Sequence, residues 1–84
     1  MGLELVGIVI RLEEEFDIKI SDEDAVRITT PGQLVDYLMA RPELAKRSRD
    51  AVAESVWQIV EQEIGIDRKH FTEQSRFIQD MGAG

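Results

Sequence analysis

Few side chains in this sequence have types and spacings that could carry out chemistry. His70 is the single histidine among the 84 residues and cysteine is absent, so the nitrogen and sulfur ligands that usually hold a metal cannot gather around one ion. The run Glu13-Glu14-Glu15 offers carboxylates for acid–base chemistry, but no nucleophile accompanies it. We therefore expect no catalytic site, no metal site and no enzymatic activity.

The balance of charge indicates the kind of partner. Seventeen acidic and ten basic residues give a net charge of −7, which repels nucleic-acid phosphates and favours a basic protein surface. The excess of acidic residues lies mainly in residues 1–40. No apolar run is long enough to span a bilayer, and the N-terminus lacks the pattern of a secretion signal. With the absence of cysteine, these features predict a cytoplasmic protein without a membrane partner.

Apolar spacing predicts helices. Residues 3–16 follow the i, i+3, i+4, i+7 pattern of an amphipathic helix. Ser21 is a cap for a short helix over Asp22–Val26, and Thr30 followed by Pro31 starts another. The longest helix is predicted over Glu43–Ile64 and ends at Gly65. The sequence therefore predicts one all-α domain: a four-helix bundle of three main helices, one short helix and a long C-terminal loop.

We expect two sets of apolar residues to form the interior. The helical set is Leu5, Ile8, Val9, Leu12, Phe16, Leu34, Val35, Leu38, Val56, Ile59 and Val60. The loop set is Ile66, Phe71, Phe77, Ile78 and Met81. Trp57 lies at the edge of the long helix's apolar stripe, where it either packs at the rim of the core or contacts another copy of the chain.

Two blocks of sequence resemble the acyl carrier protein family. Residues 12–38, LEEEFDIKISDEDAVRITTPGQLVDYL, resemble the second half of that family: the end of helix II, the short helix III and helix IV. Residues 63–84, EIGIDRKHFTEQSRFIQDMGAG, resemble the first half: the end of helix I and the long loop. The resemblance implies a circularly permuted carrier fold in which residues 1–40 are helices II–IV, 41–50 a linker, and 51–84 helix I with its loop.

The family's attachment site is altered in this sequence. In the family, the long loop ends in Asp-Leu-Gly-Ala-Asp-Ser-Leu, and that serine carries 4′-phosphopantetheine. Here the loop ends in Asp80-Met81-Gly82-Ala83-Gly84, and Gly2 falls at the serine position when the ends are joined. Because glycine has no hydroxyl, the resemblance implies no covalent cofactor in this chain. The other serines, Ser21, Ser48, Ser55 and Ser75, lie outside such a motif.

The resemblance also implies a function. It indicates a non-enzymatic, carrier-like module of fatty-acid or polyketide type that docks on basic faces of carrier-dependent enzymes. The docking residues implied are Glu4, Ile10, Glu13, Glu14 and Asp17. The alternative for these acids is a solvated helix face without a partner.

Three further alternatives remain open from the sequence. The chain is either a permutant in which the cut removed the attachment site, or a stretch taken from two tandem carriers whose serine lies outside it. The third alternative is not a carrier at all but a helical protein that associates with itself. The linker Met39–Asp50 either bends to give a closed monomer or runs as one helix, which gives a swapped homodimer.

Overall fold

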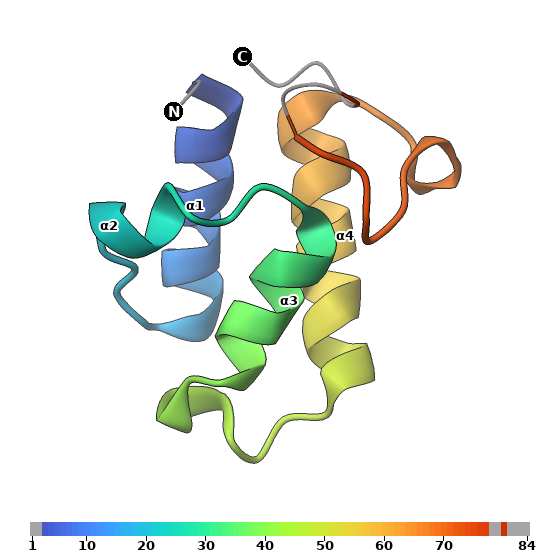
Figure 1. The fold of residues 1–84 in the computed structure, drawn as a ribbon. Helices are drawn as coiled ribbons and strands as arrows, with labels where there is room; N and C mark the ends of the chain where they lie inside the picture. Colours follow the sequence, from blue (N-terminus) through green and yellow to red (C-terminus); the bar gives the residue numbers. More distant parts are fainter. Residues whose placement is uncertain (1–2, 78–79, 81–84) are drawn as a thin grey trace.

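The computed structural model describes residues 3–77 and residue 80, leaving out the side chains of residues 3 and 4. Four α-helices follow one another: α1 (Leu3–Phe16), α2 (Asp22–Ala25), α3 (Pro31–Met39) and α4 (Arg49–Ile64). Two short 3₁₀ turns, η1 (Pro42–Leu44) and η2 (Arg68–His70), lie in the connections. No strand occurs among the described residues, so the predicted all-α class is confirmed. In Figure 1, α1 and α4 stand side by side, α3 packs against α4, and α2 lies outside α1.

Capping residues set several helix ends as predicted. The Thr30 side chain accepts a hydrogen bond from the Gln33 N–H, with Pro31 in the first turn of α3. The Ser21 hydroxyl accepts in the same way from the Asp24 N–H at the start of α2. At its other end, α4 stops at Gly65, whose φ of 77° lies in the left-handed region that glycine adopts without strain.

The predicted start of the longest helix is wrong. That helix was expected from Glu43, but α4 begins at Arg49, and the chain turns between η1 and α4. The physical reason is tertiary: Leu44, which is 1% exposed, packs into the core, and Ser48 caps the new helix by accepting a hydrogen bond from the Ala51 N–H. The linker is therefore bent, and the continuous helix through Ala45–Asp50 is not formed in this structure.

The end of α1 brings two unpredicted residues into the core. Asp17 has a φ of 53°, and the Ile18 N–H donates to the Glu13 carbonyl at 3.1 Å. This bond pattern, with a left-handed residue after the helix, is a Schellman motif. It turns the chain so that Ile18 and Ile20 are buried, although neither belongs to the predicted interior sets.

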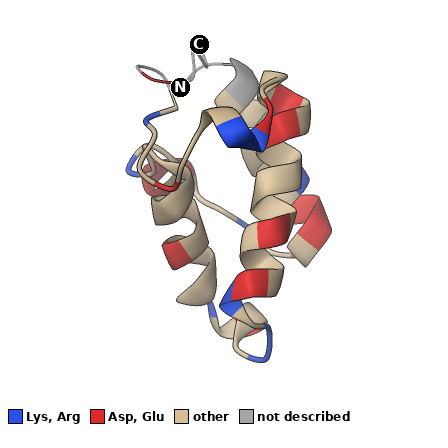
Figure 2. Cartoon of the chain, turned by 90° about the vertical axis from the view of Figure 1, so that its right-hand side faces the viewer, with Lys and Arg blue, Asp and Glu red and all other residues tan. Residues whose placement is uncertain are grey.

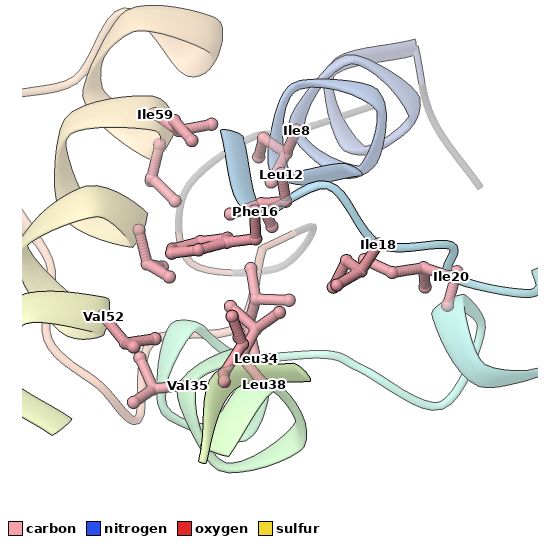
Figure 3. Close-up of a cluster of buried hydrophobic side chains, with 14 of the residues drawn as sticks. Ile8, Leu12, Phe16, Ile18, Ile20, Leu34, Val35, Leu38, Val52 and Ile59 are labelled. Atoms are coloured by element: carbon pink, nitrogen blue, oxygen red, sulfur yellow. The ribbon is translucent and has the colours of Figure 1, made fainter. Parts of the chain in front are cut away.

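The core combines all four helices with the C-terminal loop. Figure 3 shows Phe16 reaching from α1 towards side chains of α3 and α4, with Ile18 and Ile20 entering from the loop after α1. Of the predicted helical set, Leu5 and Val9 are partly buried and the others are buried. The core residues outside the two predicted sets are Ile18, Ile20, Ala25, Leu44 and Val52.

The loop after α4 packs back onto the first half of the chain. Phe71 and Phe77 are buried in the same cluster as Ile8, Val35 and Ile59, so their predicted position over the bundle is confirmed. Phe77 N–H donates to the Thr29 carbonyl at 2.9 Å, and Gly32 N–H donates to the Glu73 carbonyl at 2.8 Å. The expected packing of Met81 against Leu3 and Val6, and the anchor Ile78, lie outside the described residues.

The backbone of this loop lies against α3 at Gly32. A side chain at Gly32 should therefore weaken the packing of the loop on α3. A Cβ on Gly32 would lie 2.8 Å from the Glu73 carbonyl oxygen, a backbone atom that cannot move away alone. We expect Gly32→Ala to lower the free energy of unfolding by about 1–3 kcal/mol in urea titrations. The same variant should alter the fluorescence of Trp57, whose ring centre lies 6.1 Å from that of Phe71.

Gly7→Ala is the matched control for that substitution. The atoms nearest to its Cβ would be those of the Glu63 carboxyl group, at 3.3 Å, and that flexible, partly exposed side chain can shift. Because alanine stabilises a helix interior relative to glycine, this variant should raise the free energy of unfolding by about 0.5–1 kcal/mol. Equal stabilities for the two variants would contradict the tight packing at Gly32.

Candidate docking surface at the end of the first helix

The structure brings four of the five predicted docking residues together. Ile10, Glu13, Glu14 and Asp17 line one open groove of about 600 Å³ at the C-terminal end of α1. Ile10 is 49% exposed despite its apolar side chain. The fifth residue, Glu4, belongs to α1, but its side chain lies outside the described part of the structure, as does Gly2.

The second wall of the groove comes from residues that sequence reasoning missed. Ile18, Lys19, Arg41 and Glu43 line this side. The Arg41 guanidinium donates to the Lys19 carbonyl at 2.8 Å and to the Tyr37 hydroxyl at 2.9 Å, and it also pairs with Glu43. No local sequence pattern predicts these contacts, because Arg41 and Lys19 come together only when the chain after α3 passes the end of α1.

On this second wall, the charges of Arg41 and Glu43 are paired with each other. Hydrogen bonds from the Arg41 guanidinium lower the pKa of Glu43 to about 2. Burial and a hydrogen bond to Asp24 raise the pKa of Tyr37, because both disfavour the phenolate. At neutral pH Glu43 is therefore ionised and paired, and Tyr37 is an uncharged donor.

Glu13 is also used by the fold. Its carboxylate Oε2 accepts a hydrogen bond from the Ile20 N–H at 2.8 Å in a partly buried position. This bond fixes the connector after α1, so Glu13 serves primarily as a structural residue. Within the described part of the structure, Glu14 and Asp17 have exposed side chains with no hydrogen bond or ion pair of their own. The negative charge available to a partner in the groove thus comes mainly from these two residues, and the exposed Lys19 adds one positive charge beside them.

Two exposed apolar side chains precede the acids on α1. Val6 and Ile10 lie one turn apart and are 36% and 49% exposed, whereas a third exposed apolar residue, Val26 after α2, is 63% exposed. Of these three residues, the sequence indicated only Ile10 as a contact for a partner. Acidic rims around small apolar contacts give orientation and a faster encounter with a basic surface.

Hydroxyl side chains outside the groove take part in helix caps and turns. Ser21 and Ser48 cap helices, and Ser75 accepts from the Thr72 N–H. His70 is exposed at the end of η2, and within residues 3–77 and 80 no group of metal-binding side chains gathers. None of the described helices is both long and apolar enough to cross a membrane.

Comparisons with known proteins point to one family. A family described as "Phosphopantetheine attachment site" matches residues 3–38. An acyl carrier protein of Clostridium acetobutylicum is 42% identical over 42 residues, which are 50% of this chain and 54% of that protein. One from Buchnera aphidicola subsp. Schizaphis graminum is 47% identical over 37 residues, covering 44% of this chain and 47% of that protein.

These matches support a relationship to the acyl carrier protein family, as the sequence resemblance predicted. The chain spans about half the length of the curated relatives it matches. No solved structure matches the chain significantly. The matched segment comprises α1, α2 and nearly all of α3, together with the α1 wall of the groove.

Alanine variants of the neighbouring Glu13 and Glu14 should differ in stability, because only Glu13 is bonded within the fold. Glu13→Ala removes the acceptor of the Ile20 N–H, so we expect it to lower the free energy of unfolding by about 1–2 kcal/mol. Glu14→Ala removes an exposed side chain from the same helix and should change stability by less than about 0.5 kcal/mol. Chemical denaturation of both variants measures the difference, and equal effects would contradict the assignment of Glu13 to the fold.

Proposed function

We propose that this chain is a non-enzymatic, acyl-carrier-like module whose two halves occur in permuted order. One observation carries the proposal. The segment matched by the attachment-site family, residues 3–38, shares a single core with Phe71 and Phe77. Those two anchors belong to the block that resembles the beginning of a carrier domain, although it comes last in this sequence. Permutation keeps the packing of a fold when its original ends lie close together.

The residues present do not suit covalent attachment of 4′-phosphopantetheine. Attachment in the family needs a serine hydroxyl, and the aligned position holds Gly2. The hydroxyls of Ser21, Ser48 and Ser75 already take part in caps or turns. We therefore assign the chain no prosthetic group of its own, and its role is to dock rather than to carry an acyl chain.

The docking partner proposed is a basic face of a carrier-dependent enzyme of fatty-acid or polyketide type. Glu14 and Asp17 supply unpaired negative charge beside the exposed Ile10. Glu4 is the remaining residue proposed for this face. Complementary charge sets the encounter rate and the orientation of such a complex more than its affinity.

A second candidate is a fragment or permutant of a true carrier whose serine lies outside this chain. It is favoured by the match itself, because the matched family is defined by its attachment site and the match starts at Leu3, next to Gly2. A self-associating helical protein has weaker support at Trp57. That residue is partly buried and packs edge-on against Phe71 within its own chain.

Incubation with a phosphopantetheinyl transferase and coenzyme A tests the loss of the site. We expect intact-protein mass spectrometry to show no added mass, because no serine stands in an Asp-Ser-Leu context. Addition of one phosphopantetheine group to the unaltered chain would contradict this and reveal a second attachment residue.

A variant with its two halves exchanged in order is the positive control for that experiment. It places residues 41–84 before residues 2–40 and carries Gly84→Asp and Gly2→Ser, so that the junction reads Asp-Met-Gly-Ala-Asp-Ser-Leu. If the two halves are those of a carrier, this chain should gain one phosphopantetheine group. A reordered chain that is folded, by circular dichroism, and yet gains no mass would contradict the carrier relationship.

Binding to the same transferase tests the acidic face. We expect Glu14→Lys with Asp17→Lys to weaken binding about tenfold and to flatten its dependence on salt, because both charges face the groove. Glu15→Lys is the matched control for the single variant Glu14→Lys, since each reverses one charge on α1 but Glu15 does not line this groove. Equal weakening by Glu15→Lys and Glu14→Lys would show that only net charge matters.

A further inference from the structure

The turn between α3 and α4 is not required by its local sequence. Residues 43–47, Glu-Leu-Ala-Lys-Arg, are all good helix formers, and neither glycine nor proline occurs between Glu43 and Arg49. Pro42 stands in the first turn of η1, a position that is compatible with the start of an α-helix. Local preference thus favours one unbroken helix from Pro42 to Ile64, whereas the structure bends the chain at residues 45–48.

Three contacts keep this turn closed. Leu44 is 1% exposed within the core. The Ser48 hydroxyl accepts a hydrogen bond from the Ala51 N–H at 3.1 Å, and the Arg47 guanidinium lies 5.2 Å from the centre of the Phe16 ring. Straightening the chain would break the Ser48 cap and withdraw Leu44 and Arg47 from these positions. Basic residues mark this turn at the lower end of the molecule in Figure 2.

We propose that residues 45–48 are a hinge through which α4 and the loop after it exchange between two copies of this chain. A helix from Pro42 to Ile64 would be about 35 Å long, whereas the longest extent of the whole molecule is 32 Å. Such a helix carries α4 away from its own α1 and α3. The partner is a second copy, because only another α1–α3 unit presents the surface that α4 covers.

Exchange leaves nearly all of the core unchanged. The contacts of α4 with α1 and α3 form again between the two copies, so their free energy is the same in both states. Only the hinge contacts differ: the closed monomer has them and the exchanged dimer gains additional helical turns instead. Any change that weakens the hinge contacts alone therefore favours the dimer. Because two hinges open for each dimer, the effect per hinge enters the association constant squared.

Ser48→Ala is the direct test of this hinge. It removes the cap of α4 and places a better helix former in the middle of the continuous helix, so both effects favour exchange. We expect about a tenfold shift per hinge, which is about a hundredfold increase in the association constant. Sedimentation velocity on the full chain, refolded over a range of concentrations, measures that shift. Circular dichroism of the dimer should show more helix than the monomer.

Ser21→Ala is the matched control, because it removes an equivalent exposed cap far from the hinge. The Ser21 Oγ accepts a hydrogen bond from the Asp24 N–H at 3.1 Å. This variant should lower stability without increasing dimerisation. Added to Ser48→Ala, Lys46→Gly places a poor helix former in the middle of the continuous helix. It should therefore reduce the association constant about twentyfold. Leu44→Ala weakens the same closed state by a second route and should shift the equilibrium in the same direction as Ser48→Ala.

The outcomes separate exchange from ordinary association. Dimerisation that increases with Ser48→Ala and decreases again with Lys46→Gly supports the hinge. Folded Ser48→Ala and Leu44→Ala proteins that remain monomeric at millimolar concentration would overturn it. A dimer that forms equally with Ser21→Ala would also overturn it. None of these results depends on the docking role proposed for the acidic groove.

Discussion

Burial of one face of α4 against α1 and α3 is the constraint on which the rest of this structure depends. Val52, Val56 and Val60 of α4 are fully buried, and Ile59 beside them is 4% exposed. A chain of 84 residues without cysteine has no disulfide to compensate for a weak core. These contacts join the second half of the sequence to the first, so they also determine whether the chain closes into one domain.

The connection after α3 follows from that constraint. To reach α1, α4 must turn back, and the linker bends because Leu44 enters the core while Ser48 restarts the helix. Just before this bend, Arg41 and Glu43 lie past the end of α1, where they form part of the second wall of the acidic groove. Hydrogen bonds to the Lys19 carbonyl and the Tyr37 hydroxyl hold Arg41 there, so its position is set by the end of α1 and by α3.

The loop after α4 depends on the helices for its position. Its own hydrogen bonds lie in η2, in the Thr72–Ser75 turn and between Arg76 and Asp80. It is held on the helices by Phe71, Phe77, the two backbone bonds to Thr29 and Gly32, and ion pairs of Arg68 and Glu73 with α4. The loop in turn closes the side of the bundle where Leu5, Ile8 and Leu34 lie near Phe77.

The sequence by itself determined the helical class, the caps at Ser21 and Thr30, the stop at Gly65 and most of the core, because these depend on local spacing and on side chains that bond to nearby backbone groups. It also located Ile10, Glu13, Glu14 and Asp17 on one helix end. Only the tertiary structure decided the start of α4, the burial of Ile18, Ile20 and Leu44, the commitment of Glu13 to Ile20, and the wall formed by Arg41. Each of these depends on contacts between segments that no local pattern relates, and such contacts override helix preference where burying an apolar side chain gains more free energy than extending a helix.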